Sequence, residues 1–387
     1  MNSKQFETAK MYLKVVTPIN ISDGIVLGAK DYLYDSRRQK VYFLNLHQWH
    51  MFIYKHVLLK KYESYLANFR DKQSLLEWLR MQGYDIDDVR TVITSEAQAT
   101  VNLMDNEKKK TLNDINRHIQ QPDGSLYVPG SSIKGVFRTA ILYSLLQKRQ
   151  DIKVKYWRQI QEKISSNYFK PYRDFNKLIS DLENELLHTL RLVDGDIHSN
   201  NAVYSAMRGL QVSDTYASRN MQTAILQKVD GGFDKFGKAS PKKLPIFREC
   251  MLPKAELFFD VKIEKAVMST IGINTVDDLL KATHSFFAAV TDLLQQAFEK
   301  EYQEAFQGVA AGNMFLGGNT GFLSKTLLAM LAPDKDTAKN TIKVLLDKSF
   351  KNHKHLLRDK IIAPRTLKCT NYNGKLMLMG VAEVRKV

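Results

Sequence analysis

Hydrophobic and polar positions follow two patterns along the chain. The first pattern consists of short runs rich in β-branched residues between turn-prone stretches, and it predicts β-strands. Residues 11–21 (MYLKVVTPINI) form the first run, and Pro18 near its end is typical of a strand that leads into a turn. A second strand is expected over residues 40–46, directly after the turn-prone sequence YDSRRQK. Two further strands are expected over residues 208–217 and 249–264.

The second pattern places leucines and aromatic residues three and four positions apart, which predicts α-helices. It holds over residues 47–80, and another helix begins near Ile133. Residues 153–192 are expected to be helical with a break at Pro171. Residues 275–306 form the clearest helix, because they open with a threonine and two aspartates, which are typical N-terminal residues of helices.

Four further segments are distinguished by their charged, glycine-rich or turn-forming residues. Residues 83–124 are polar and contain the charge run NEKKK, so we expect an irregular or partly helical insertion. Residues 230–243 combine glycines, a proline and lysines, which indicates an exposed flexible arm or a hairpin tip. Residues 312–331 form a glycine-rich turn that leads into an apolar helix. Residues 366–387 contain Asn373-Gly374, the strongest short signal for a β-hairpin.

The order of these elements mixes strands with helices and joins neighbouring strands by a hairpin, which predicts an α+β fold with largely antiparallel sheets. A chain of 387 residues is longer than the usual size of a domain with a single hydrophobic core. Its content of 44% hydrophobic residues is sufficient to form a sizeable interior. We therefore expect two domains, over residues 1–247 and 248–387. Their boundary near Arg248 is placed loosely, and the two domains can interleave.

The net charge narrows the classes of function. Lys and Arg number 57 against 41 Asp and Glu, which gives a formal net charge of +16. An excess of this size favours a polyanionic partner, with nucleic acid first, over small anionic ligands alone. A basic surface kept for solubility, or one that faces a membrane, is the alternative.

Cysteine usage and hydropathy point to a cytoplasmic protein. Cys250 and Cys369 are far apart and lack zinc-ligand spacing, so we expect neither a disulfide framework nor a zinc finger. The first ten residues are polar with no apolar segment behind them, and no apolar run reaches membrane-spanning length. Neither export nor membrane insertion is indicated.

Residues 127–146 (YVPGSSIKGVFRTAILYSLL) combine a glycine-serine turn with a helix that is apolar almost all round. The N–H groups at a helix N-terminus attract anions, and Lys134 and Arg138 lie one turn apart near that end, so this segment is expected to bind phosphate. The spacing is not that of a P-loop, and ATP hydrolysis is not indicated. In the alternative, Ser131 or Ser132 caps the helix and Lys134 points to water.

Two more segments are candidates for phosphate contacts. Residues 315–326 (FLGGNTGFLSKT) repeat the glycine-rich turn and carry Lys325, although glycines also let two protein segments pack closely. Residues 351–368 (KNHKHLLRDKIIAPRTLK) place a dense basic cluster beside His353 and His355, which indicates a phosphate track. A solvated basic face is the alternative for this cluster.

The histidines do not form a recognisable metal site. His47, His50 and His56 lie in one helical segment, but His56 faces away from His47, so one metal ion cannot bind all three. The sequence DGDIHSNN could hold a hard cation, serve a nuclease, or form a turn through Asp194, Asp196 and His198. No complete ligand set accompanies it, so we expect neither a metal nor another cofactor.

Five segments together closely resemble the RAMP-superfamily subunit at the head of the type III-A CRISPR Csm complex, where the 3′ region of the guide RNA ends. They are YVPGSSIKGVFRTAIL, MYLKVVTPINISDG, MRGLQVSDT, FLGGNTGFLSKT and HKHLLRDKIIAPRTLK, and they run from near residue 12 to the C-terminus. The most specific is PGSSIKG leading into a helix with an arginine, because related RAMP proteins share it.

The resemblance implies two ferredoxin-like, RRM-type domains with helical insertions. It implies a structural subunit that binds and caps the guide RNA (crRNA) and is involved in its maturation without carrying the cleaving residues. Its partners would be crRNA, target RNA as a further candidate, and the backbone and small Csm RAMP subunits, with no membrane and no obligate homo-oligomer. The residues expected to contact RNA are Gly130, Ser131, Ser132, Lys134, Arg138, Arg208, Gly317, Gly318, Lys325, Lys354, Arg358 and Arg365.

The chain departs from the family pattern at Leu356, where an acidic residue is expected after His-Lys-His, and this weakens a catalytic or metal role for His353 and His355. The aromatic strand motif with which ordinary RRM proteins stack bases is not recognisable, so RNA contacts are expected from backbone and loops. Two hypotheses compete with the leading one. The first is a RAMP endoribonuclease that processes precursor crRNA with His198, His353 or His355 as general acid or base, and the second is a basic scaffold that touches only proteins.

Overall fold

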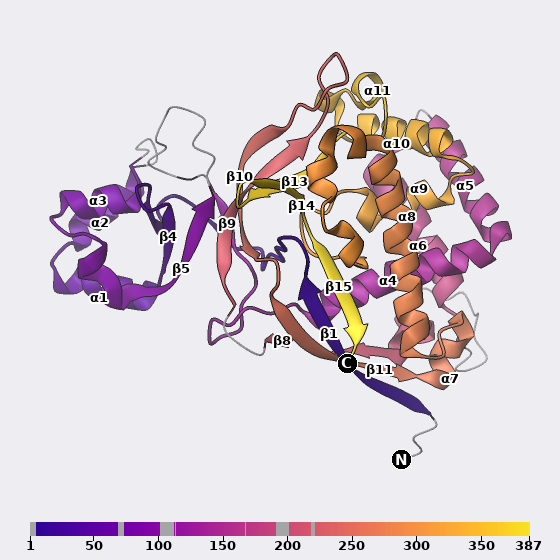
Figure 1. Cartoon of the computed structure of the whole chain (residues 1–387), viewed down its shortest axis with the longest axis horizontal. Coiled ribbons are helices and arrows are strands. Elements are labelled where there is room, and N and C mark those ends of the chain that lie inside the picture. Colours follow the sequence, from indigo (N-terminus) through magenta and orange to yellow (C-terminus); the bar gives the residue numbers. More distant parts are fainter. Residues whose placement is uncertain are drawn as a thin grey trace.

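The computed structural model describes residues 5–68, 73–100, 112, 114–166, 168–190, 201–217 and 221–387. It contains two β-sheets, with most of the helices gathered on one side of them and a smaller lobe on the other (Figure 1). Adjacent strands are antiparallel in all but two pairs of the described residues. The predicted α+β class with largely antiparallel sheets is confirmed.

The first sheet has the strand order of a ferredoxin-like domain. Its path is β12 (Met314–Phe315), β15 (Val381–Lys386), β1 (Phe6–Val15), β11 (Glu256–Glu264) and β7 (Leu210–Val212), and β8 (Tyr216–Ala217) also pairs with β11. Two helices pack on one face of it, α4 (Gly130–Lys148) and α8 (Val276–Tyr302). In chain order the unit runs β1, α4, β7, β11, α8 and β15. Strands from both ends of the chain are therefore neighbours in one sheet (Figure 1).

The period of two along β1 separates the two faces of this sheet. Ala9, Met11, Leu13 and Val15 are buried against the helices, whereas Lys10 between them is exposed on the opposite face. On the helical side, Thr275 caps α8 in a capping box, because its side chain accepts from the backbone N–H of Asp278, whose carboxylate accepts from the backbone N–H of Thr275. The predicted strand and the predicted helix N-terminus are both confirmed.

The second sheet contains most of the remaining strands. Its path is β2 (Val26–Leu27), β6 (Ile115–Asn116), β10 (Lys242–Met251), β9 (Thr223–Gly231), β5 (Ile93–Thr100), β4 (Lys40–Leu44) and β3 (Tyr32–Asp35). One edge of β9 pairs with β5 in its first half and with β13 (Leu367–Tyr372) in its second, and β14 (Lys375–Leu378) follows β13. Asn373 and Gly374 both have positive φ values, 50° and 76°, so the predicted hairpin between β13 and β14 is confirmed.

The smaller lobe has an apolar core of its own. Helices α1 (Leu46–Lys55), α2 (Leu59–Ala67) and α3 (Leu75–Met81) pack on β3 and β4 through an aromatic cluster that includes Trp49, Tyr62 and Trp78 (Figure 1). Its helices confirm the prediction for residues 47–80. The 3-10 helix over Ile86–Val92 fits the irregular or partly helical insertion expected over residues 83–124, whereas strand β5 does not, so that expectation is wrong for residues 93–100.

The remaining helices include α5 (Gln150–Ser165), α6 (Pro171–Leu187), α7 (Lys265–Met268), α9 (Leu328–Leu331), α10 (Lys335–Ser349) and α11 (His355–Arg358), and α10 contacts α5, α6, α9 and α11. Pro171 stands in the first turn of α6, which confirms the predicted break. The apolar helix expected within residues 312–331 is reduced to the four residues of α9. Gly317 and Gly321 have φ values of 87° and 93°, so the chain before α9 is a turn rather than helix.

The predicted boundary between residues 247 and 248 lies inside β10, and both sheets combine strands from both sides of it. The division into two domains stays a prediction. The strand predicted over residues 249–264 is two strands, since the chain turns at Pro253 and Lys254 between β10 and β11. Among the described helices, none has the length and apolar character needed to cross a membrane.

A buried histidine beside β6 makes stability depend on pH. His118 is fully buried, and burial lowers its pKa from 6.5 to about 4. Because the unfolded chain binds the proton more readily, the folded state loses stability as pH falls from 6.5 towards 4, by about 3 kcal/mol. We expect His118→Leu to reduce this loss, measured as the change in urea unfolding free energy between pH 7 and pH 4.5. An equal loss in the variant and the parent chain would contradict the assignment.

Candidate nucleic-acid interface

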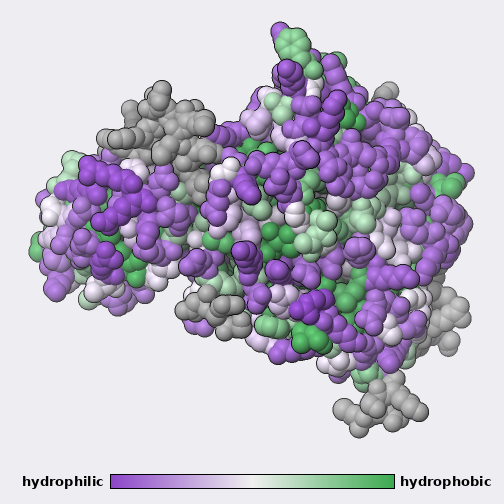
Figure 2. All heavy atoms as spheres, viewed as in Figure 1, coloured by the Kyte–Doolittle hydropathy of each residue, from purple (hydrophilic) through white to green (hydrophobic). Residues whose placement is uncertain are grey.

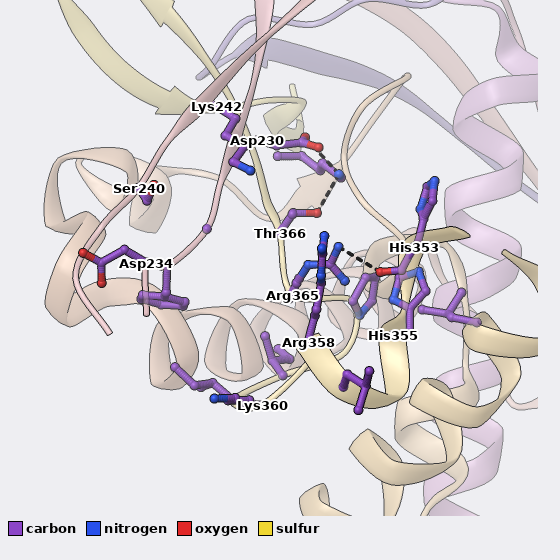
Figure 3. Close-up of a pocket in the computed structure, with 18 of the residues that line it drawn as sticks. Asp230, Asp234, Ser240, Lys242, His353, His355, Arg358, Lys360, Arg365 and Thr366 are labelled. Carbon is purple, nitrogen blue, oxygen red and sulfur yellow. Dashed lines mark hydrogen bonds and ion pairs between the residues drawn. The ribbon is translucent and has the colours of Figure 1, made fainter. Parts of the chain in front are cut away.

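A cleft of about 1270 Å³ lies between the β9–β10 hairpin and the segment that follows α10 (Figure 3). The hairpin forms one wall with Ser240 and Lys242, and residues 350–365 form the other. Lys228 on β9 and Lys368 on β13 line it where these two strands pair. Hydrophilic residues dominate the surface that Figure 2 shows around this hairpin. The pairing of β9 with β13 therefore joins two segments that are more than a hundred residues apart in the sequence.

Positive charge dominates the cleft. Its lining includes two aspartates, Asp230 and Asp234, against seven lysines and arginines: Lys228, Lys235, Lys242, Arg358, Lys360, Arg365 and Lys368. Asp230 is already paired, with Lys368 at 2.9 Å and Lys228 at 3.7 Å. Asp234 accepts from the backbone N–H groups of Phe236 and Lys238 and so closes the hairpin turn. The carboxylates therefore leave much of the positive charge available to a ligand.

Apart from Lys235, whose ammonium lies over the ring of Phe236, three of these cations are free to bind an anion. Within the described ranges, Lys242, Arg358 and Lys360 have no carboxylate oxygen within 4.0 Å. They come from both walls, with Lys242 on the hairpin and the other two at and after α11 (Figure 3). A single-stranded polyanion lying in the cleft would therefore meet cations on both sides.

A buried aspartate shapes the wall that carries Arg358. The carboxylate of Asp359 is fully buried and lies 2.8 Å from Nδ1 of His355 and 2.7 Å from Nη1 of Arg365. Nη2 of Arg365 donates to the carbonyl oxygen of His353 at 3.3 Å. These contacts tie α11 to the start of β13, so the cations of this wall are held by a fixed backbone.

The glycine-rich loop before α9 packs on the chain between β1 and β2. The N–H of Gly318 donates to the carbonyl oxygen of Asn20 at 2.7 Å, and a Cβ at Gly317 would lie 2.4 Å from the same oxygen. The alternative for residues 315–326, that their glycines let two protein segments pack closely, is therefore observed. The side chain of Asn20 donates to the carbonyl oxygen of Glu249 at 2.8 Å and accepts from Nη1 of Arg248 at 3.1 Å.

Three cations beside this loop have lowered pKa values. Burial lowers the pKa of Arg248, of Lys228 and of Lys325, and the positive charge of Arg248 lowers the last two further. Lys325 is nonetheless exposed at the surface, so a ligand can reach its side chain. Positive charges placed this close together favour a bound anion.

These cations continue into the cleft. Lys368 also lowers the pKa of Lys228, and its side chain lies next to Gly321 of the glycine loop. We call the combined surface the basic track: Arg248, Lys325, Lys228, Lys368, Lys242, Arg365, Arg358 and Lys360. The track includes Lys325, Arg358 and Arg365 from the sequence-based set, and Gly317 and Gly318 lie beside it.

The start of α4 is occupied by the chain itself. The N–H of Gly130 donates to Oδ1 of Asp214 at 2.7 Å, and a Cβ there would lie 2.3 Å from the carbonyl oxygen of Val212. Nζ of Lys134 donates to the carbonyl oxygen of Leu210 at 2.6 Å, and partial burial lowers its pKa. Arg138 forms an ion pair with Glu183. These contacts support a structural role for the α4 start, next to β7 rather than in the track.

The other candidate residues of the sequence analysis lie outside the track. Pro129 is the N-cap of α4, so Ser131 and Ser132 belong to its first turn and neither caps it. Arg208 is exposed and donates to the carbonyl oxygen of Val203 at 3.4 Å. Lys354 is exposed directly before α11, with a left-handed φ of 52°. Whether these residues contact RNA stays a prediction.

The α4 start can be tested by removing its charges. We expect Lys134→Gln with Arg138→Gln to lower the melting temperature, because a half-buried donor and an ion pair are lost, and to leave RNA affinity within about twofold. Thermal unfolding and RNA titration of the same preparation measure both quantities. A large loss of affinity at an unchanged melting temperature would instead make the α4 start a phosphate site.

Sequence reasoning missed Arg248, Lys228 and Lys242 as site residues. The lysines of residues 230–243 and the cluster of residues 351–368 were recognised separately, but only strand pairing places them around one cleft. Arg248 and Lys228 lie within strands and have no local motif. Alternation along β9 and β10 could have indicated which of their side chains share a face.

The histidine candidates differ in their surroundings. His355 is buried against Asp359, whereas the exposed ring of His353 stacks on Phe350 with centroids 5.7 Å apart. His198, with Asp194 and Asp196, lies outside the described residues. Nδ1 of His56 lies 2.8 Å from the hydroxyl of Tyr84. In the described part of the chain, no group of three or more His, Cys, Asp or Glu side chains is placed to hold a metal ion.

Comparison with known proteins assigns the family. The model of the RAMP superfamily matches residues 12–322, so the chain belongs to the RAMP superfamily. The resemblance noted in the sequence is thereby confirmed.

Several relatives are Csm5 proteins. A CRISPR system Cms protein Csm5 from Mycobacterium tuberculosis (strain H37Rv) is 26% identical over 98% of this chain and 97% of its own length. The Csm5 of Enterococcus italicus is 22% identical over 88% of this chain and 85% of its own. A chain in the cryo-EM structure of a type III-A Csm-crRNA-target RNA ternary complex superposes with a TM-score of 0.67 at 17% identity, covering 98% of this chain and all of that one. The crystal structure of T. onnurineus Csm5 gives 0.59 at 17% identity, over 96% of this chain and 99% of that one.

Proposed function

We propose that this chain acts as the Csm5-type structural subunit of a type III-A CRISPR ribonucleoprotein, in which it binds the guide RNA and caps its 3′ region. The proposal rests on the similarity to Csm5 proteins along nearly the whole chain and on the shared fold. In this role it contacts crRNA, target RNA and the other Csm subunits in the cytoplasm. It takes part in guide maturation and antiviral defence without cutting RNA itself.

The observation that carries the proposal is the basic track. A cleft of about 1270 Å³ with cations on both walls fits the backbone of a single RNA strand, because phosphates follow one another along it. The rim adds exposed rings at Phe350 and His353, on which an unstacked base can lie. A small anionic substrate would leave most of these cations without a partner.

A salt titration of the full chain tests the proposal. If the track neutralises about six phosphates of single-stranded RNA, the logarithm of the binding constant falls against the logarithm of salt with a slope of about −4. Oligonucleotides of different sequence should give similar slopes, since phosphate contacts carry no sequence information. A slope near zero would contradict electrostatic binding by the track.

The alternative of a crRNA-processing endoribonuclease gains no specific support from the described residues. His355 is buried at 7% exposure and its Nδ1 contacts Asp359, so it cannot meet a substrate without a change of structure. His353 is exposed, and its described hydrogen bonds are made by its backbone, from its N–H to Phe350 and from Arg365 to its carbonyl oxygen. We therefore propose a non-catalytic role for both histidines.

A further inference from the structure

The open face of the first sheet, opposite α4 and α8, carries a row of aromatic and cationic side chains. Strand pairing sets Arg385 on β15 opposite Tyr12 on β1, Tyr12 opposite Phe258 on β11, and Phe258 opposite Tyr216 on β8. The row therefore crosses four strands in one register. The sequence shows no aromatic strand motif because these aromatic residues are far apart in the chain and meet only through strand pairing. That RNA contacts come from backbone and loops stays a prediction.

The side chains of the row contact one another directly. The rings of Tyr12 and Phe258 meet edge to face with centroids 5.6 Å apart, and those of Phe258 and Tyr216 are stacked at 6.0 Å and 30°. The guanidinium carbon of Arg385 lies 4.4 Å from the centre of the Tyr12 ring. Nζ of Lys10 lies 5.5 Å from the Tyr216 centroid and 5.2 Å from that of Phe258. The same face carries a second pair, with Nζ of Lys262 4.2 Å from the centre of Phe6.

Two members of the row are exposed to solvent. Tyr216 is 47% exposed and the side chain of Arg385 is 56% exposed, whereas Tyr12 between them is 9% exposed. The hydroxyl of Tyr12 donates to Glu256 at 2.8 Å, and Glu383 lies 4.0 Å from Arg385. Each partner of the contact between Tyr12 and Arg385 is therefore also held by a carboxylate. Arg385 and Tyr216 stand three strand spacings apart, about 14 Å.

From this arrangement we propose that the open face of the first sheet binds unstacked bases of a single-stranded nucleic acid, one on the ring of Tyr216 and one on the guanidinium plane of Arg385. Aromatic rings and arginine planes are the surfaces on which proteins stack bases, and RRM domains do so on the face of such a sheet. Tyr216 and Arg385 stand on the strands that flank its two central strands, β1 and β11. Lysines beside the rings suit the phosphates that connect the bases. A protein partner fits less well, because lysine is depleted from the cores of protein interfaces.

This inference rests on the proposed RNA-binding function but concerns a surface separate from the basic track. Binding of a fluorescent single-stranded RNA oligonucleotide by the full chain tests it, with Tyr216→Ala, Arg385→Ala and Tyr216→Phe as variants. Tyr54, an exposed tyrosine on α1, supplies the matched control Tyr54→Ala. We expect each of the first two variants to lose roughly 5- to 150-fold in affinity, as for a lost stacking contact. Tyr216→Phe and Tyr54→Ala should stay within about twofold, and the salt slope of Tyr216→Ala should equal that of the parent chain.

Several results would overturn the inference. Unchanged affinity in both alanine variants would exclude stacking, and an equal loss in Tyr216→Phe would assign the effect to the hydroxyl rather than the ring. Loss of assembly with other subunits at unchanged RNA affinity would make this face a protein interface. Photocrosslinking of a 5-iodouridine oligonucleotide to the unaltered chain avoids any folding defect, and we expect adducts on Tyr216 or Tyr12, whose absence would also count against it.

The same titration separates this inference from the proposed function. If variants of the basic track abolish binding while those of the sheet face bind normally, the inference fails and the proposed function stands. If the sheet variants lose affinity while track variants bind normally, the inference stands and the track loses its role.

Discussion

A chain with Lys242→Glu, Arg358→Glu and Lys360→Glu is expected to bind single-stranded RNA on the order of 100-fold more weakly than the parent chain at about 0.15 M salt. These three cations face the cleft from both walls without a carboxylate partner in the described residues, so their reversal puts negative charge against phosphate. The salt slope should become shallower by about 2, since three phosphate contacts are lost. Fluorescence anisotropy over a range of salt concentrations measures both quantities.

A control with the same change of net charge is available on the smaller lobe. Lys55, Lys60 and Lys61 are exposed on and beside α1 and α2, away from the cleft. Their reversal to glutamate should weaken binding several-fold at most, through the overall charge. Equal losses in the two triple variants would show that total charge, rather than the cleft, determines the affinity, and would contradict the proposed site.

Replacing Asp359 by alanine is expected to lower the free energy of unfolding by about 3 kcal/mol or more. Its buried carboxylate contacts both Arg365 and His355, so the substitution leaves the half-buried guanidinium of Arg365 without its counter-charge. Urea unfolding followed by circular dichroism gives the difference between variant and parent.

The exposed pair between Arg158 and Glu162 on α5 provides the comparison. Nε of Arg158 lies 3.8 Å from Oε1 of Glu162, and both side chains are mostly exposed. Glu162→Ala should therefore lower the free energy of unfolding by well under about 1 kcal/mol. If Asp359→Ala and Glu162→Ala destabilise the chain equally, the buried aspartate does not hold this wall of the cleft as described.

Local signals in the sequence predicted the parts of the fold that local chemistry determines. Thr275 and the two aspartates after it cap α8, and Asn373-Gly374 forms the expected turn, because each depends on residues within four positions. Strand β5 was missed, since ITSEAQAT is polar and its place depends on pairing with β4 and β9. The interior of a sheet is set by distant partners that a single segment does not reveal.

In the candidate site, too, local sequence signals and distant strand pairing point to different residues. The α4 start carries every local mark of an anion site, yet Asp214, 84 residues later, accepts from its first N–H group. The basic track has a weaker signal in any one segment of the sequence, because its cations come from β9, β10, β13 and the segment after α10. Density of charge in one segment therefore predicted Arg358 and Arg365, but strand pairing was needed to find Lys228 and Arg248.

If the basic track holds the guide RNA, crosslinking of RNA to protein in the assembled complex should find the guide on the residues of the track. Complexes carrying a photoreactive guide would be irradiated and digested, and the crosslinked peptides identified by mass spectrometry. We expect adducts from residues 228–248 and 350–368, lost when Lys242, Arg358 and Lys360 are reversed to glutamate. Adducts confined to other segments of the chain, with none from these two, would contradict it.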